Sequence, residues 1–313
     1  LSAHRPGAVG AQTRGCRRSN PGLSAGARLR RVTAFADLPD AERADAAAVA
    51  ALIAGVGRLG VAYSGGVDSA VLLAVATRAL GRENAVGLLA VSDSLASDEH
   101  ALARTTAEQM GAQLVEFATH EGDNPAYRAN DADRCFHCKD ELFTRIADDI
   151  VVDHRLDAVA YGENADDAVR IDRPGARAAT DHAVLRPLAD AGLTKPRVRA
   201  LARALGLAVA DKPAAPCLAS RIPHGQEVTP IKLRQVDEAE SALRHHGFTD
   251  SRVRHHGDIA RIEVPVAELA RFADDGVRAA VLADVGAAGF PYVTLDLAGI
   301  QSGAFTLQVL RHG

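Results

Sequence analysis

The sequence predicts an α/β protein with a parallel sheet and a second, smaller α+β domain. Between residues 59 and 161, short apolar segments alternate with longer amphipathic ones, which is typical of parallel strands joined by helices that cover both sheet faces. From residue 229 onward, the order becomes helix, strand, strand, helix and strand, which suits a small mixed domain. A chain of 313 residues is long enough for about two domains with separate cores.

The first part of the fold is predicted to alternate strands with helices. The expected strands span 59–63, 85–91, 113–117 and 156–161. The expected helices span 39–55, 97–110, which Ser97 should cap, and 134–152. A further helix is expected after the hexapeptide 64–69 within the stretch 59–80, with Asp68 and Ser69 in its first turn. Ligands of open parallel sheets bind beyond the carboxyl ends of the strands. We therefore expect a Rossmann-like sheet whose site is formed by the segments after the first and fourth strands.

The second part begins with a helix from Lys195 to Leu205, started by Thr194 and Pro196 and stopped by Gly206. A loop with three prolines follows at 211–227, and loops of this length are usually functional or disordered. The C-terminal elements are expected at 229–246 (helix), 251–255 (strand), 259–264 (strand), 266–288 (helical stretch) and 292–297 (strand). We place the domain boundary near residue 225, which gives domains 37–225 and 226–313.

The first strand is joined to its helix by the hexapeptide Ser-Gly-Gly-Val-Asp-Ser. Its members are Ser64, Gly65, Gly66, Val67, Asp68 and Ser69. The glycines let the backbone approach a ligand closely, and the N–H groups at a helix N-terminus form a nest for phosphate. A Walker A loop is excluded because its Gly-Lys-Ser/Thr ending is absent. A Gly-Gly pair alone would be explained as a turn, whereas the complete hexapeptide between strand and helix indicates phosphate binding.

Composition limits the class of protein. Hydrophobic residues make up 47% of the chain, but no apolar run approaches the ~18 residues of a membrane span. We therefore expect a soluble, cytoplasmic protein without a membrane partner. With 8 Phe, 4 Tyr and no Trp, the core must be built from Ala, Leu and Val. Four cysteines in a chain of this size favour metal binding or catalysis in a reducing compartment over a disulfide framework.

Charge is unevenly distributed along the chain. The formal net charge is −4, and the first 36 residues carry seven arginines without an acid, so the remainder carries −11. A nucleic-acid partner normally requires a basic face, and this acidic balance argues against one. The segment 1–36 lacks hydrophobic periodicity and is predicted to be a disordered, non-functional tail that includes Cys16. An organellar transit peptide or a later translation start would also explain its composition.

Three cysteines remain outside that tail. Cys135 and Cys138 stand three residues apart at the start of a predicted helix, where both sulfur atoms lie on one face. A zinc site, a redox pair and two packed thiols are all compatible with this spacing. Zinc favours four protein ligands, and Cys217 is the only further cysteine. Three thiolates with one open position also suit a [4Fe–4S] cluster.

Cys217 lies in the proline-rich loop, four residues before Arg221. A lone cysteine is more often buried and inert than reactive. A nearby cation lowers the pKa of a thiol and raises its thiolate fraction, so we expect Arg221 to activate Cys217. Such a thiolate would be a competent nucleophile toward an activated carboxyl group.

Taken together, the motifs resemble the LarE family, ATP-dependent sulfur-inserting enzymes of nickel-pincer nucleotide biosynthesis. The hexapeptide resembles the PP-loop of the ATP pyrophosphatases, which cleave ATP between its α and β phosphates. The other motifs are Cys135-Phe-His-Cys138, residues 162–167 with Arg173-Pro174-Gly175, residues 216–223, Arg252-Val-Arg254-His-His-Gly257 and residues 292–297. The resemblance runs from about residue 38 to residue 303 and implies a PP-loop ATP pyrophosphatase fold.

The resemblance also implies a substrate, cofactors and residue roles. The substrate would be pyridinium-3,5-biscarboxylic acid mononucleotide, the cofactors ATP and Mg²⁺, and the assembly a hexamer held by the C-terminal domain. The hexapeptide would bind the ATP phosphates, and Asp68 would also assist Mg²⁺. The substrate would be bound by Arg221, Arg252, Arg254, Asn164 and Asp167. Helix capping would equally explain Asn164 and Asp167, and the His pairs at 245–246 and 255–256 are expected at the surface or in a turn.

The family resemblance offers two sulfur sources. Members with only the loop cysteine sacrifice its sulfur and keep dehydroalanine, whereas members with an added CxxC resemble cluster-dependent enzymes that turn over repeatedly. Cys135 and Cys138 place this chain with the second group, so we expect these two residues and the catalytic Cys217 to hold a [4Fe–4S] cluster. A single-turnover Cys217 donor and a PP-loop tRNA thiolase remain alternatives, and a non-enzymatic nucleotide-binding module is a third.

Overall fold

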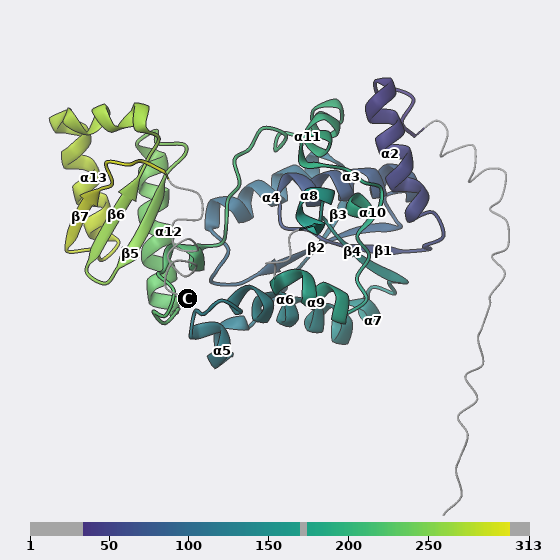
Figure 1. Cartoon of the computed structure of the whole chain (residues 1–313), viewed down its shortest axis with the longest axis horizontal. Coiled ribbons are helices and arrows are strands. Elements are labelled where there is room, and N and C mark those ends of the chain that lie inside the picture. Colours follow the sequence, from purple (N-terminus) through teal and green to yellow (C-terminus); the bar gives the residue numbers. More distant parts are fainter. Residues whose placement is uncertain (1–33, 170–173, 301–313) are drawn as a thin grey trace, which may run out of the picture.

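The computed structural model describes residues 34–169 and 174–300 of the chain. Residues 1–33 of the predicted tail, including Cys16, lie outside the described part. The described chain forms a larger α/β layer structure and a smaller sheet with its own helices, joined by the exposed segment before Cys217 (Figure 1).

The larger sheet has four parallel strands in the order β3-β2-β1-β4. The strands are β1 (Leu59–Ala62), β2 (Ala85–Val91), β3 (Gln113–Ala118) and β4 (Ala158–Tyr161). Leu59 of β1 is opposite Ala85 on one side and Ala158 on the other. The chain thus adds β2 and β3 on one side of β1 and β4 on the other, which makes the end of β1 the switch point where ligands of such sheets bind. The predicted Rossmann-like α/β fold is confirmed.

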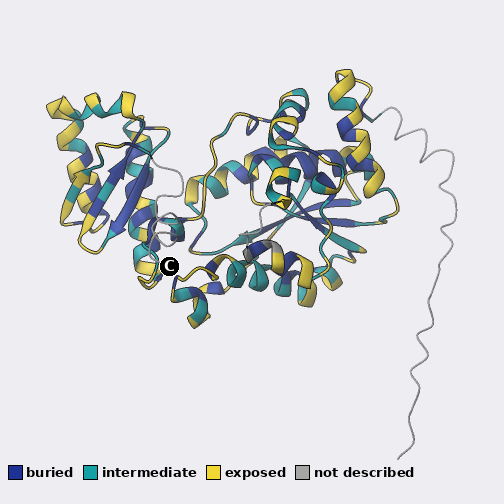
Figure 2. Ribbon diagram, in the orientation of Figure 1, coloured by how far each residue is buried: buried dark blue, intermediate teal, exposed yellow. Residues whose placement is uncertain are grey.

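Helices cover both faces of this sheet (Figure 1). On one face, α3 (Val67–Leu80) packs with α2 (Asp40–Leu52) and α11 (Lys195–Ala204). On the other, α6 (Arg134–Arg145) packs with α9 (Pro174–Asp181). Burial is concentrated in the strands and inner helix faces (Figure 2). The main core consists almost entirely of Ala, Val and Leu, as the low aromatic content predicted.

Several predicted boundaries change in the structure. The helix expected over 134–152 is α6 followed by a π-helical turn, Ile146–Ile150, and the short α7, Val151–Asp153. Helix α4 (Ser97–Gln109) is not capped by Ser97: Ala96 occupies the N-cap position, and the Ser97 amide donates to the Asp237 carboxylate 3.1 Å away. The sequence also did not predict η1 (Glu121–Asp123), α5 (Pro125–Arg128), α8 (Ala165–Ala168), α9 or α10 (Pro187–Asp190).

The second sheet has three strands in the order β5-β6-β7. Strands β5 (Arg252–His256) and β6 (Ile259–Glu263) are antiparallel, and β7 (Tyr292–Leu295) runs parallel to β6. Helices α12 (Pro230–His245) and α13 (Asp275–Ala287) pack on it. The helical stretch predicted over 266–288 consists of two helices. The first, η4 (Val266–Ala273), ends before Asp274, whose carboxylate caps α13 at the Val277 amide, 2.9 Å away.

The proline-rich loop is partly ordered by packing. Its second half contains a 3₁₀ turn, η3 (Leu218–Arg221), that the sequence did not predict. Leu218, Ala219 and Ile222 are buried in a cluster with Tyr127 and residues of α12. The segment after Cys217 is therefore a fixed part of the fold. In the described ranges, each helix is too short or too polar to traverse a bilayer.

Candidate functional site

The hexapeptide forms a compact loop at the end of β1. The Ser69 hydroxyl accepts from the Ser64 amide at 3.2 Å and donates to the Gly66 carbonyl at 3.0 Å. The Gly66 amide in turn donates to the Ser64 hydroxyl at 3.4 Å. Asp68 and Ser69 lie in the first turn of α3, as predicted. These contacts hold the loop closed around the N-terminus of a fourteen-residue helix, where backbone amides favour anions.

Two glycines are required by this geometry. Gly65 has a φ of 72°, and a Cβ there would lie 2.7 Å from the Cβ of Ala103. Gly162, at the end of β4, packs its backbone against the first turn of α3, since a Cβ would lie 2.5 Å from the Ser69 amide nitrogen. A side chain at either position would displace the loop, so these glycines set its distance from the neighbouring strand and helix.

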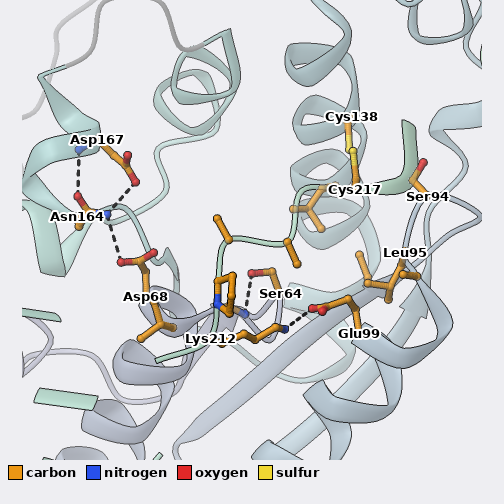
Figure 3. A pocket seen from close by; sticks show the side chains of 18 of the residues that line it. Ser64, Asp68, Ser94, Leu95, Glu99, Cys138, Asn164, Asp167, Lys212 and Cys217 are labelled. Carbon is orange, nitrogen blue, oxygen red and sulfur yellow. Dashed lines mark hydrogen bonds and ion pairs between the residues drawn. The ribbon is translucent and has the colours of Figure 1, made fainter. Parts of the chain in front are cut away.

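Polar residues after β4 extend this site (Figure 3). The Asn164 amide donates to Asp68 at 3.2 Å and to Asp167 at 2.8 Å. Its oxygen accepts from the Asp167 backbone at 3.0 Å, so the predicted capping role of Asn164 is confirmed. The Lys195 ammonium forms an ion pair with the other Asp68 oxygen, and the Lys195 amide donates to Asp166 at 2.8 Å. Asp68 is thus connected to Asn164 and Lys195.

These residues surround a cavity of about 580 Å³ beyond the strand ends. Its lining includes Ser64, Gly66, Val67, Asp68, Asn164, Asp167, Lys195, Lys212, Cys138 and Cys217. The segment 212–217 lies along one side of the cavity, where Lys212 forms an ion pair with Glu99 of α4 (Figure 3). Arg199 fixes the start of this segment by donating to the carbonyl oxygens of Ala210 and Lys212. The cavity thus brings the hexapeptide, two lysines and two cysteines together.

The three cysteines come close together although Cys217 is far along the chain. Cys135 and Cys138 lie in the first turns of α6, and Cys217 directly precedes η3. Burial raises the pKa of the Cys138 thiol well above its usual value, and the nearby Glu121, Cys217 and Cys135 raise it further. Cys138 and Cys217 both line the cavity (Figure 3), and Cys135 contributes to the raised pKa of each of them.

Cys217 differs from the expectation in one respect. Burial of its thiol raises the pKa, although part of the residue reaches solvent, and this outweighs the lowering by Arg134 and, to a lesser extent, by Arg221. Arg221 thus lowers the pKa of Cys217, as expected, but burial outweighs it and the net shift is upward. The cation with the larger effect on Cys217 is Arg134, which the sequence did not single out.

The three cysteines offer sulfur donors to a metal or a cluster. No three His, Cys, Asp or Glu side chains are placed to hold a single metal ion in the described ranges. A cubane cluster does not require one shared point, because each thiolate binds a different iron. Three cysteines in one electrostatic neighbourhood, two of them facing the cavity, are a soft donor set suited to such a cluster.

The three arginines expected to bind the substrate phosphate lie away from the cavity lining. Arg221, Arg252 and Arg254 are all buried. Arg221 forms a bidentate ion pair with Glu240 at 2.8 and 3.1 Å, and Arg254 forms one with Glu263 at 3.0 and 2.9 Å. Burial and the charges of Arg221 and Arg254 lower the pKa of Arg252. The arginines thus form a positive cluster at the junction of η3 and β5.

Other residues depart from the sequence expectations. His255 is buried, not exposed: it packs edge-on against Phe290 with ring centroids 5.2 Å apart and contacts Gln235 at 3.1 Å. Lys195 and Lys212 were missed as site residues. Lys195 opens α11, and a cation is unfavourable at a helix N-terminus. That mismatch was the available signal that Lys195 lines the cavity, where it is paired with Asp68.

The chain is similar to several known proteins. A family profile described as NAD synthase matches residues 53–143, from the end of α2 to α6. A pyridinium-3,5-bisthiocarboxylic acid mononucleotide synthase of Lactiplantibacillus plantarum is 36% identical over 246 residues, which cover 79% of this chain and 88% of the relative. A protein of Synechocystis described as uncharacterized is 41% identical over 243 residues, 78% of this chain and 90% of the relative.

A more distant relative, described as an uncharacterized protein of Methanocaldococcus jannaschii, is 26% identical over 204 residues, 65% of this chain and 76% of its own length. The match to the Lactiplantibacillus synthase extends over most of both chains, and the NAD synthase profile covers the hexapeptide and the CxxC turn. These matches support an ATP-using enzyme. With the hexapeptide, the cysteine segment and the two sheets in place, this chain belongs to the LarE family of PP-loop enzymes.

Proposed function

We propose that this protein inserts sulfur into the carboxyl groups of pyridinium-3,5-biscarboxylic acid mononucleotide at the expense of ATP. The observation that carries the proposal is that one cavity is lined by the PP-loop and by Cys138 and Cys217. Such a cavity can activate a carboxylate with ATP and present it to sulfur without release of the reactive intermediate. The Lactiplantibacillus relative, named for the bisthiocarboxylic product, supports the choice of substrate.

ATP activates the carboxylate in the first step. A carboxylate oxygen attacks the α-phosphorus, pyrophosphate leaves, and an acyl-adenylate forms. The amides of Gly66 and Val67 and the positive end of α3 would bind the phosphates. Asp68 would coordinate Mg²⁺ together with phosphate oxygens, and the ammonium of Lys195, now paired with Asp68, would turn to the phosphates.

Sulfur replaces the adenylate in the second step. A sulfur nucleophile attacks the acyl carbon, and AMP leaves with the former carboxylate oxygen. Cys135, Cys138 and Cys217 would hold a [4Fe–4S] cluster, which supplies sulfide to the reaction when bound. In that case no protein sulfur is consumed, and Cys217 serves as a ligand in place of a nucleophile.

The substrate phosphate is proposed to bind at the arginine cluster, Arg221, Arg252 and Arg254. Arg221 and Arg254 are each paired with a glutamate. The pKa of Arg252 is lowered first by burial and then by the charges of Arg221 and Arg254, and a bound phosphate would offset both effects with charge-assisted hydrogen bonds. The cluster lies next to Ser220, close in sequence to Cys217.

The second sheet, in residues 226–313, is proposed to mediate assembly into a hexamer. Its outer strand β7 and the residues after it expose apolar side chains, with Tyr292 64% and Leu297 81% exposed. Exposed apolar side chains on an edge strand are typical of a surface that another chain covers. Sedimentation of the purified protein would measure the assembly state.

The proposal is tested by anaerobic reconstitution with iron and sulfide, followed by incubation with ATP, Mg²⁺ and the biscarboxylate mononucleotide. We expect repeated formation of the thiocarboxylate with AMP and pyrophosphate. Alanine at Cys135, Cys138 or Cys217 should abolish both visible cluster absorption and multiple turnover. Loss of one H₂S in mass from wild-type Cys217, without bound iron, would establish the sacrificial donor instead. Thiolation of tRNA but not of the mononucleotide would replace the proposal with the tRNA enzyme.

A further inference from the structure

Asn130, five residues before the CxxC motif, is held in an unusual position. It is completely buried and its φ is 57°, in the left-handed region that Asn tolerates better than most residues. Its side-chain nitrogen lies 3.2, 2.8 and 3.1 Å from the carbonyl oxygens of Ile222, Pro223 and Gln226. One side chain thus binds three backbone groups of the segment that follows Cys217.

The backbone around Asn130 strengthens the same junction. The Asn130 carbonyl accepts from the Gly225 amide at 3.1 Å and lies 3.1 Å from Nδ1 of His224. The Arg128 carbonyl accepts from the Val228 amide at 2.9 Å. Together these contacts join residues 128–130 to residues 222–228 along their backbones.

Arg134 connects this junction to the cysteines. The guanidinium of this buried residue donates to the Asn130 side-chain oxygen and, at 3.0 Å, to the carbonyl of Ala219. Arg134 directly precedes Cys135, and Ala219 is two residues after Cys217. The pair Asn130–Arg134 therefore connects the start of α6 to the backbone on the C-terminal side of Cys217.

Other anchors of the Cys217 segment lead to different elements. The Leu218 amide donates to the Ser94 carbonyl at 3.0 Å, which ties the segment to the entry of α4. Arg254 of β5 donates to the Ser220 carbonyl at 3.0 Å. Neither contact fixes the distance between Cys217 and the thiols of α6. The Asn130–Arg134 pair does so, because it contacts both partners directly.

We propose that Asn130 and Arg134 are positioning residues that hold Cys217 in register with Cys135 and Cys138. Asn is suited to this position because its amide both donates to carbonyls and accepts from Arg134, while its backbone adopts the left-handed conformation. The inference rests on the proposed function for the importance of three convergent thiols. The positions of the three thiols can be tested in the protein without substrate or metal.

The test measures how readily pairs of thiols are bridged by dibromobimane, which forms two C–S bonds, releases two bromides and becomes fluorescent. Full-length protein with Cys16→Ser and Cys135→Ser reports on the Cys138–Cys217 pair. Protein with Cys16→Ser and Cys217→Ser reports on the Cys135–Cys138 pair. This second pair lies within α6, so it serves as an internal control that the junction should not affect.

The principal variant is Asn130→Gly, because glycine keeps the left-handed backbone accessible and removes only the side-chain contacts. Loss of these contacts lets the Cys217 segment occupy more positions, so we expect a fall of about tenfold in the Cys138–Cys217 bridging rate, equivalent to about 1.4 kcal/mol. The Cys135–Cys138 rate should stay unchanged. Arg134→Lys, which keeps the charge but loses the guanidinium fork, should also slow Cys138–Cys217 bridging.

Asn84→Ala is the matched control variant. It removes a hydrogen bond from an Asn side chain to a backbone carbonyl, that of Leu80, at the far end of α3. We expect wild-type bridging rates for both pairs. The proposal would be overturned if both junction variants bridged Cys138 and Cys217 within about twofold of wild type. An equal slowing of both thiol pairs would also overturn it, since the effect would then be a general loosening of α6. ATP and substrate are absent, so either result is independent of sulfur transfer.

Discussion

Replacement of Lys195 by alanine should impair adenylation more than folding. The Lys195 ammonium lies in the cavity beside Asp68, at the N-terminus of α11. A hydrogen bond to a charged group contributes about 1.5–3 kcal/mol, which corresponds to roughly 10- to 150-fold in rate. The Lys195 side chain is 37% exposed, and solvent screening weakens such interactions. We therefore expect a loss toward the lower end, about 10- to 30-fold in kcat/KM for ATP.

The assay is substrate-dependent release of AMP and pyrophosphate at limiting ATP. Lys232→Ala is the matched control, because the Lys232 ammonium donates to the Glu227 carbonyl outside the cavity lining. Both variants should melt near the wild-type temperature. If Lys195→Ala kept kcat/KM within about twofold of wild type, Lys195 would have no role in phosphate binding and the assignment would be refuted.

Three further predictions address the loop, the arginine cluster and the second sheet. Gly65→Ala should lower the free energy of unfolding in urea by at least about 2 kcal/mol, because of backbone strain and contact with Ala103. Gly111→Ala is the control, since Gly111 has a similar φ but open space around it, and it should lower the free energy of unfolding less. Equal losses in the two variants would show that contact with Ala103 contributes nothing. Arg252→Ala should raise the KM of the mononucleotide at least about tenfold with little change in the KM of ATP. A larger change in the KM of ATP would show that Arg252 does not bind the mononucleotide. Burial lowers the pKa of His255 below the usual 6.5, so the unfolded state takes up protons first and the free energy of unfolding should fall as pH drops below about 6.5. His255→Asn should flatten this fall in urea titrations, and an unchanged slope would exclude His255 as its cause.

The larger sheet was predictable because its signals are local. The apolar strands and the hexapeptide lie within a few residues of each other, and strand–loop–helix order follows from hydrophobic periodicity. The need for glycine at position 65 is likewise local, because it follows from the backbone conformation of a single turn. The same local reasoning placed Asn164 as a helix cap, which the structure confirms at the Asp167 amide.

The arginine partners could not be predicted from local patterns. Arg221 is paired with Glu240, nineteen residues away on α12, and Arg254 with Glu263 on the adjacent strand. Alternation along β5 suggested one exposed face, yet residues 252–255 are all buried. Helix α12 and η3 both contact this strand. Burial of a strand on both faces depends on tertiary packing, which a single sequence does not specify.

The cysteine site, too, was predictable where the signal is local and not where it depends on tertiary packing. The spacing of Cys135 and Cys138 predicted a shared helical face, and both lie at the start of α6. The environment of Cys217 was misjudged because burial and Arg134, not the sequence neighbour Arg221, dominate its pKa. Arg134 and Asn130 gave no sequence signal, since their partners lie more than eighty residues away.

The most direct test of adenylation follows the oxygen of the substrate carboxylate. The mononucleotide is prepared with ¹⁸O in its carboxyl groups and incubated with the reconstituted protein, ATP and Mg²⁺, and the nucleotide products are analysed by mass spectrometry. The proposed chemistry transfers one ¹⁸O atom to the phosphate of AMP for each thiocarboxylate formed. Unlabelled AMP, or ADP and inorganic phosphate as the primary products, would contradict carboxylate adenylation at the PP-loop.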